Sequence, residues 1–141
     1  MFAEAIVCLA LNVYHEARDQ PFIGQVAVAQ VVMNRVYDYR YPDHPCEVVF
    51  QGPTYSWKPD FPVRHRCQFS WYCDGKSDKV YDEDAYKQAL TIAHGVYYDN
   101  LDDFVEGATH YHAVYVLPEW AESKTPVVQI CLLSTSDAAD D

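Results

Sequence analysis

Residues 11–35 constrain the fold of this chain more than any other segment. They read LNVYHEARDQPFIGQVAVAQVVMNR, the pattern of a helix that ends in a charged corner and is followed at once by a very apolar second helix. Glu16 lies at the end of the first helix, behind apolar and aromatic residues. Such surroundings raise the pKa of a carboxyl group, which can then hold a proton at neutral pH and donate it. Glu16 is therefore the leading candidate for a catalytic acid.

Apolar residues at helical spacing organise most of the remaining chain. They predict helices over residues 3–18, 22–38, 45–51 and 82–98. The second of these carries the broadest apolar stripe, so we expect it to be the central helix of the domain. Asp19 is expected to cap the turn between the first two helices, and Pro21 suits the first helical turn after it. Asp82 is the expected N-cap of the last helix.

The remaining segments are predicted to be irregular or extended. Residues 52–81 contain several Gly and Pro residues, and a loop of this length inside a domain is usually functional. Residues 108–116 and 127–133 read as extended pieces that can pair as a hairpin. We therefore expect an α+β fold, mainly α, with a small β-hairpin near the C-terminus. Residues 1–133 would form one catalytic domain, and the acidic residues 134–141 a disordered tail.

Composition and charge argue against some functions. A chain of 141 residues, half of them apolar, forms one globular domain with a hydrophobic core. Its net charge is −11, and −8 remains when Asp137, Asp140 and Asp141 are left out. This balance argues against nucleic acid as a partner and against non-specific adhesion to anionic surfaces. Twelve Tyr, six Phe and three Trp suggest a cleft that stacks on ring-shaped ligands, although an aromatic core would use most of them.

The N-terminal segment and the cysteines bear on the compartment. The start of the chain lacks a basic region and carries Glu4 early, and its apolar run is too short to cross a bilayer. We therefore expect neither a signal peptide nor membrane insertion. The five cysteines are odd in number and form no CxxC pair. Free thiols in a reducing compartment are the simpler interpretation, with one disulfide that involves Cys67 or Cys73 as the alternative.

Five short motifs follow one another along the chain. They are Glu16-Ala17-Arg18 with residues 24–29 and 34–35, CEVVFQ at 46–51, QFSW at 68–71, GATHYH at 107–112 and PEW at 118–120. In this order they resemble the SleB/CwlJ-type cell wall hydrolases, known from spore germination and phage lysis. The resemblance covers residues 5–130. It implies a lysozyme-like helical domain, similar to that of the lytic transglycosylases, and the glycan strand of peptidoglycan as substrate.

The resemblance places the catalytic acid on Glu16. A general acid there would protonate the glycosidic oxygen while an oxocarbenium-like centre develops on the sugar. The second carboxylate of two-carboxylate glycosidases has only weak candidates here, Asp19 and Asp74. A single Glu suffices in enzymes of the lytic transglycosylase type, where the muramic 6-hydroxyl attacks and the Glu accepts its proton. The expected product carries a 1,6-anhydromuramoyl end, or a hydrolysed muramoyl end if water attacks, and no cofactor is expected.

Residues around the motifs are candidates for substrate binding. Gln20 stands where many relatives in the family carry a second Glu, so it would supply a polar contact only. Gln68 and Ser70 are candidates for hydrogen bonds to N-acetyl groups. Phe69 and Trp71 would share one side and stack on pyranose rings if their segment is extended. The alternative is that these two rings anchor the loop in the core.

The late motifs add candidates on a strand. His110 and His112 would share one face of it, where they would bind sugar hydroxyls or orient the catalytic acid, or else fill a structural role. Tyr111 would face the opposite way and is a further candidate, as is Trp120 in the turn that follows. Residues 131–134 read CLLS where the family usually carries a Gly-x-His-x-Phe-like segment. We therefore expect a shortened last hairpin.

Two other functions stay open at this point. His15-Glu16 resembles the start of the zinc motif HExxH, but Asp19 stands where that motif has its second His. A zinc metallopeptidase would need His15 and Asp19 to be joined by His110 or His112. The second alternative is a non-catalytic glycan-binding module, which the aromatic content would serve equally well.

The resemblance also carries expectations about the partner and the place of action. The partner would be the glycan strand of peptidoglycan, bound by a monomer. The lack of a visible signal peptide fits a phage-type lysis enzyme, made in a host cytoplasm and delivered to the bacterial cell wall, or a fragment of a longer precursor.

Overall fold

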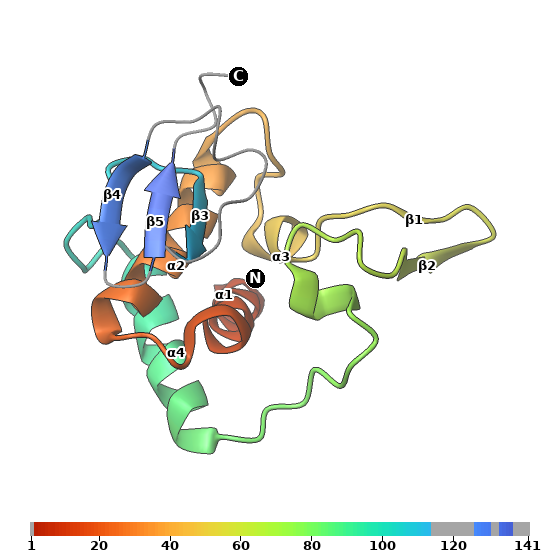
Figure 1. Ribbon diagram of the computed structural model, residues 1–141, viewed down its shortest axis with the longest axis horizontal. Helices are drawn as coiled ribbons and strands as arrows, with labels where there is room; N and C mark the ends of the chain where they lie inside the picture. The colour runs from red at the N-terminus through yellow and green to blue at the C-terminus, as the bar shows by residue number, and fades with distance from the viewer. Residues whose placement is uncertain (1, 114–125, 131–132, 137–141) are drawn as a thin grey trace.

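Four α-helices and two small antiparallel sheets make up the described part of the chain (Figure 1). The structure, a computed structural model, describes residues 2–113, 126–130 and 133–136, with side chains within residues 3–111. The helices are α1 (Phe2–Ala17), α2 (Phe22–Tyr37), α3 (Pro45–Val49) and α4 (Glu83–Tyr97), with a 3-10 helix η1 (Ser70–Cys73). The strands are β1 (Thr54–Tyr55), β2 (Lys58–Pro62), β3 (His110–Ala113), β4 (Pro126–Ile130) and β5 (Leu133–Ser136). The mainly helical α+β fold expected from the sequence is confirmed.

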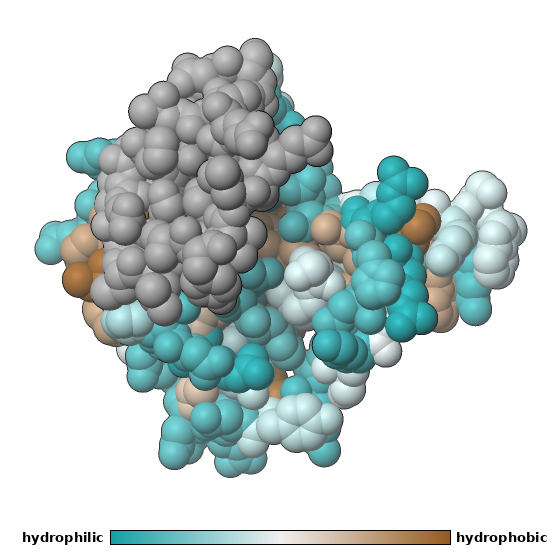
Figure 2. Space-filling model, in the orientation of Figure 1, coloured by the Kyte–Doolittle hydropathy of each residue, from teal (hydrophilic) through white to brown (hydrophobic). Residues whose placement is uncertain are grey.

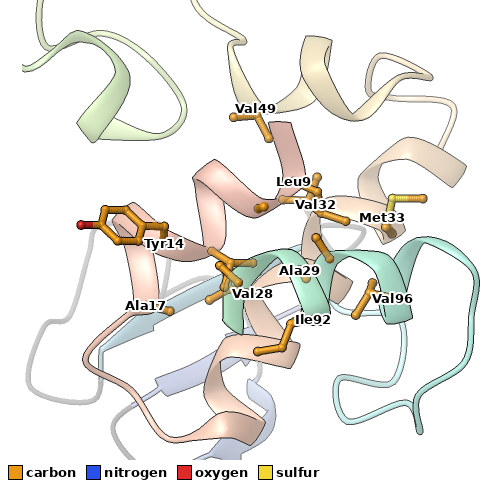
Figure 3. Close-up of a cluster of buried hydrophobic side chains, with 14 of the residues drawn as sticks. Leu9, Tyr14, Ala17, Val28, Ala29, Val32, Met33, Val49, Ile92 and Val96 are labelled. Carbon is orange, nitrogen blue, oxygen red and sulfur yellow. The ribbon is translucent and has the colours of Figure 1, made fainter. Parts of the chain in front are cut away.

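Helix α2 is the central helix of the domain, as its apolar stripe predicted. All residues from 24 to 33 are buried, and α1, α3 and α4 pack against it. Figure 3 shows side chains from all four helices meeting in one cluster, among them Leu9, Val32, Val49 and Ile92. Burial of each large aliphatic side chain contributes roughly 1.5–3 kcal/mol, which stabilises the framework of the candidate site. None of the described helices is long and apolar enough to cross a bilayer.

One hydroxyl group ties α1 to the start of α4. The Tyr14 Oη accepts hydrogen bonds from the backbone N–H groups of Asp82 and the residue before it, at 3.0 and 3.1 Å. The Asp82 side chain accepts from a backbone N–H in the first turn of α4 at 3.0 Å, so the predicted N-cap is confirmed. The expected cap at Asp19 is wrong, because α2 begins after Pro21 without a hydrogen bond from a capping side chain.

The C-terminal sheet has three antiparallel strands in the order β3-β5-β4. The predicted hairpin between residues 108–116 and 127–133 is wrong in its pairing, because β5 lies between the two strands. Residues 134–136 belong to β5, so they are neither a disordered tail nor the end of a shortened hairpin. Pairing on both edges stabilises β5, although its sequence LSTS has little intrinsic strand propensity. Residues 137–141 lie outside the described part of the chain.

Two disulfide bonds connect parts of the chain that the sequence left separate. Cys8 in α1 is bonded to Cys46 in α3, and Cys67 is bonded to Cys73 at the end of η1. The expectation of free thiols is therefore wrong for these four residues, and the alternative of a disulfide that involves Cys67 or Cys73 is confirmed. No spacing rule marks Cys8 and Cys46 as partners, because their contact arises only when α3 packs on α1.

The segment of residues 52–81 is more ordered than its Gly and Pro content predicted. It contains the antiparallel hairpin of β1 and β2 and the helix η1. The hairpin points away from the helices, whereas η1 returns to them (Figure 1). The segment therefore divides into a projecting part and a part that contacts the core.

Candidate active site

Glu16 lies in the last turn of α1, and protein groups largely enclose its carboxyl group. Tyr111 from β3 and Arg35 from the end of α2 are its polar neighbours. Burial raises the pKa of Glu16 above its ordinary value, and this effect outweighs the Tyr111 hydroxyl and the Arg35 charge, which both lower it. A carboxyl group that keeps its proton more readily than in water is suited to act as a general acid.

Arg35 supplies a buried positive charge to the site. Its Nε donates to the Thr109 carbonyl oxygen at 2.8 Å, and its Nη1 donates to the Gln68 Oε1 at 3.3 Å. The guanidinium also lies over the ring of Phe69, with its central carbon 5.3 Å from the ring centroid. These contacts compensate the burial of the guanidinium, since Arg35 is only 5 % exposed. Its charge favours the ionised form of Glu16.

A chain of polar side chains leads from η1 to the region of Glu16. The Trp71 Nε1 donates to the Asn12 Oδ1 at 2.9 Å. Because an indole N–H can only donate, this bond orients the Asn12 amide so that its Nδ2 is left for Tyr111. The Asn12 Nδ2 and the Tyr111 Oη are both buried, and neither meets full hydrogen-bond geometry with a described group. Such buried groups are expected to find a partner at some stage of the function.

The Tyr111 hydroxyl keeps its proton at all physiological pH values. Burial raises the pKa of Tyr111 well above its ordinary value, and the charge of Glu16 raises it further. The phenol therefore faces the carboxyl group as a donor. When Glu16 is ionised, the O–H of Tyr111 can donate to it and hold it in one orientation.

The structure shows which face of β3 meets Glu16, a point that the sequence left open. Tyr111, not His110, faces the carboxyl group of Glu16. His110 is half-exposed, and its Nδ1 lies 3.2 Å from the Thr109 Oγ1. His112 is the third residue of β3, and its side chain lies outside the described part of the structure. Alternation along a strand gives two faces but does not tell which one the helices cover.

The alternative zinc site is not assembled within the described residues. His15 Nε2 lies 3.1 Å from the Asp78 carbonyl oxygen, and its ring stacks on Trp71 with centroids 4.4 Å apart. Burial lowers the pKa of His15, which favours its neutral form. No three His, Cys, Asp or Glu side chains of residues 3–111 converge as metal ligands. His15, Asp19 and His110 therefore do not form the proposed set.

The predicted substrate-binding residues of the loop divide into two kinds. Phe69 and Trp71 are 4 % and 8 % exposed, so they anchor the loop in the core rather than offer an open ring to a sugar. Their segment is not extended, because η1 begins at Ser70. Gln68 and Ser70 are exposed, although the Gln68 side-chain oxygen already accepts from Arg35.

Gln20 and Trp120 complete the predicted set. Gln20 follows Glu16 by four residues, and its side-chain Oε1 is buried without a hydrogen-bond partner among the described groups. Its backbone oxygen accepts from the Gln25 Nε2 at 3.0 Å. Trp120 lies outside the described residues.

Asn12 and the position of Arg35 beside Glu16 were not expected from the sequence. Asn12 precedes Glu16 by four residues, so both lie on one face of a helix, and this spacing was a usable signal. In the sequence, Arg35 stood out only as part of the first family motif. Its position as the single charged residue of a largely apolar helix was the clue that it is buried.

Comparison with known proteins identifies sequences and structures that are similar to this chain. The sequence model described as Cell Wall Hydrolase matches residues 19–131. A spore cortex-lytic enzyme from Halalkalibacterium halodurans is 33 % identical over 106 residues, which cover 75 % of this chain and 26 % of that protein. The chain thus spans about a quarter of the length of this curated relative.

Two solved structures share the fold. The catalytic domain of the Bacillus cereus SleB protein matches with a TM-score of 0.65 and 24 % identity, over 95 % of this chain and 91 % of that chain. The catalytic domain of the germination-specific lytic transglycosylase SleB from Bacillus anthracis matches with a TM-score of 0.62 and 23 % identity, over 94 % and 93 %. The family match covers most of the chain and the fold agrees with it, so this chain belongs to the cell wall hydrolase family.

Proposed function

We propose that this chain cleaves the glycan strand of peptidoglycan, with Glu16 as its single catalytic acid and then base. The observation that carries the proposal is the enclosed Glu16 carboxyl group, whose pKa burial raises, beside a protonated Tyr111. The relatives support the substrate, because one is a spore cortex-lytic enzyme and another is a lytic transglycosylase. The place of action would be the bacterial cell wall. Two disulfides suit such oxidising surroundings.

The proposed reaction has two steps that use one carboxyl group. Glu16 first donates its proton to the glycosidic oxygen, the bond from that oxygen to C1 of the muramoyl sugar breaks, and positive charge develops at C1. The 6-hydroxyl of the same sugar then attacks C1 and gives its proton to the ionised Glu16. The proton balance closes, no water is consumed, and the product ends in a 1,6-anhydromuramoyl unit. In the hydrolytic variant, water takes the place of the 6-hydroxyl.

The surroundings of Glu16 favour a mechanism with one carboxylate. The groups that shift the pKa of Glu16 are Tyr111 and Arg35, and neither is a carboxylate. Asp19 is exposed. The charge of Asp74 raises the pKa of His15, and Asp74 is not among the groups that shift the pKa of Glu16. After the first step, the Tyr111 O–H and the Arg35 charge would stabilise the ionised Glu16 until it accepts the second proton. All these residues belong to one chain, so we propose the monomer as the active unit.

Digestion of purified peptidoglycan tests the proposal. The Glu16→Gln variant should release soluble fragments at least a hundredfold more slowly than the unchanged chain, because amides cannot donate the required proton. Glu47→Gln, which removes an exposed carboxylate from α3, is the matched control and should retain activity. Mass spectrometry identifies the outcome: products lighter by one water mean transglycosylation, and reducing muramoyl ends mean hydrolysis. Reducing N-acetylglucosamine ends, or release of stem peptides, would contradict the proposal.

A further inference from the structure

A hairpin arm leaves the domain and returns to it at one point. The arm comprises residues 52–67, with β1 and β2 paired antiparallel inside it. It is closed at its base by a hydrogen bond from the Gln68 N–H to the Gln51 carbonyl oxygen at 2.9 Å. The disulfide between Cys67 and Cys73 fastens the same base to η1. In Figure 1 the arm projects away from the helices, so it is a separate extension on a fixed base.

The arm contributes little to the core, yet it carries large aromatic side chains. None of residues 52–67 is buried. Trp57 is 75 % exposed and Phe61 is 51 % exposed. The rings of Tyr55 and Trp57 lie 5.2 Å apart between centroids, and the Lys58 Nζ lies 3.9 Å from the centroid of Phe61. Single exposed aromatics are common on proteins, but two exposed rings and the half-buried Tyr55 on one projecting hairpin make it a candidate binding surface.

The charge of the arm is opposite to that of the whole chain. Residues 52–67 carry the basic residues Lys58, Arg64 and Arg66 and the acidic residue Asp60, which gives +2, whereas the chain carries −11. Figure 2 shows the arm at the right, where pale and strongly hydrophilic residues lie next to one another. A surface that combines aromatic faces with cations is complementary to anionic saccharides.

We propose that the arm binds the glycan strand of peptidoglycan, with its anionic peptide stems, at sugars distant from the bond that Glu16 would cleave. This inference rests on the proposed function. The faces of Trp57 and Phe61 would stack on the C–H faces of the sugar rings, and the cations would pair with carboxylates of the peptide stems. The base of the arm adjoins the active site, since Gln68 accepts a hydrogen bond from Arg35. A strand held by the arm is thus kept close to Glu16.

An anionic membrane surface is the rival partner, because aromatic and basic side chains also suit lipid headgroups. The charge of the whole chain favours the glycan. A bilayer presents a broad negative surface that would repel a protein of net charge −11, whereas a single glycan strand meets only the basic arm.

Sedimentation with insoluble, purified peptidoglycan tests the arm. The full chain with Glu16→Gln allows binding to be measured without digestion. In this background, Trp57→Ala should weaken binding roughly tenfold. Tyr39→Ala is the matched control, because Tyr39 is 96 % exposed but lies outside the arm, and it should bind as the parent does. Equal binding by the two variants would overturn the proposal.

Binding to vesicles of phosphatidylglycerol and phosphatidylethanolamine is the second measurement. We expect that Trp57→Ala does not change binding to these vesicles. If the parent bound them and Trp57→Ala abolished that binding, the proposal would be overturned in favour of a membrane. Both variants should unfold at the same temperature as the parent, since the two side chains are largely exposed. The binding readout is independent of catalysis. If the chain with Glu16 intact released no soluble fragments, the proposed function would fail, while Trp57-dependent binding to peptidoglycan would still be measurable.

Discussion

Tyr111 and Glu16 influence each other's protonation across the junction of β3 and α1. The Tyr111 hydroxyl lowers the pKa of Glu16, while the charge of Glu16 adds to the burial that raises the pKa of Tyr111. Both effects follow from the approach of the Tyr111 hydroxyl to the Glu16 carboxyl group. A phenol that keeps its proton can donate to a carboxylate, which favours protonated Tyr111 beside ionised Glu16. Tyr111 is therefore placed to position the proposed catalytic group and to adjust its acidity, and the two roles can be separated by experiment.

The Tyr111→Phe variant should shift the pH dependence of the reaction. Without the hydroxyl, burial acts on Glu16 with less opposition, so the pKa of Glu16 rises further. The first step needs protonated Glu16, so the alkaline limb of the rate profile should move to higher pH. The maximal rate should fall about tenfold, because the ionised acid loses a donor. Rates of fragment release across a pH series measure both effects.

Tyr37→Phe serves as the control for that series, since Tyr37 is 76 % exposed at the end of α2. Its profile should match that of the unchanged chain. If Tyr111→Phe slowed the reaction without moving the alkaline limb, Tyr111 would have a structural role only.

The Glu16→Gln variant should be more stable than the parent at neutral pH. Because the folded-state pKa of Glu16 is raised, its contribution to stability is fully present below the ordinary carboxyl pKa and is lost as the pH rises through the folded value. The amide that replaces the Glu16 carboxyl group stays neutral at every pH, so the variant does not lose this stability as the pH rises. We expect the free energy of unfolding to increase by on the order of 1 kcal/mol at about pH 7, with no increase at about pH 4.

Urea denaturation at the two pH values measures this difference. Glu47→Gln removes an exposed carboxylate and should change the free energy of unfolding equally at both. A Glu16→Gln chain that is less stable than the parent at neutral pH would show that the Arg35 charge, and not burial, dominates around the carboxyl group.

The Trp71→Phe variant should destabilise the domain through Asn12. Phenylalanine fills most of the indole volume but cannot donate to the Asn12 Oδ1, which would leave a buried acceptor without a partner. The expected loss in the free energy of unfolding is about 1–3 kcal/mol. Trp57→Phe makes the same chemical change at an exposed position and should cost under about 0.5 kcal/mol. Similar losses for both variants would mean that the bond to Asn12 contributes nothing.

The two disulfides should have different roles. Replacing Cys8 and Cys46 by serine removes a disulfide whose cysteines are 38 residues apart in the sequence. Replacing Cys67 and Cys73 by serine removes one whose cysteines are 6 residues apart. The first pair should therefore cost more stability, within a range of about 2–4 kcal/mol. Loss of the Cys67–Cys73 bond should lower the free energy of unfolding less but lower the rate of fragment release more, because it frees the loop that carries Trp71.

Thermal unfolding and fragment release, measured on both double variants, give the comparison. The prediction fails if the variant without the Cys67–Cys73 bond keeps full activity at a temperature at which it is folded. Treatment of the unchanged chain with a reductant should reproduce the combined losses.

The sequence predicted most of what depends on local pattern. The periodicity of residues 22–38 was enough to identify the central helix, and Asp82 was recognised as a cap because a cap acts within one helical turn. The raised pKa of Glu16 was expected for the same reason, since its apolar neighbours lie on its own helix. These features need only residues that are close along the chain.

The features that were missed depend on contacts between distant segments. The pairing of Cys8 with Cys46 and the hydrogen bond from Arg35 to the Thr109 carbonyl oxygen arise only after the helices pack. The orientation of Tyr111 depends on which face of β3 meets α1, and β5 is stabilised by partners on both edges rather than by its own residues. Propensity and spacing contain no information on such packing.

The order of strands in the C-terminal sheet has a kinetic consequence. Asn12 and Glu16 share one helix and Arg35 lies on the next, whereas Tyr111 is held in register by Thr135 of β5. Contacts between segments far apart along the chain form late, because the intervening chain must first be confined. We expect the helices to assemble before β5 joins the sheet, so a folding molecule would acquire its shape first and the complete surroundings of Glu16 last.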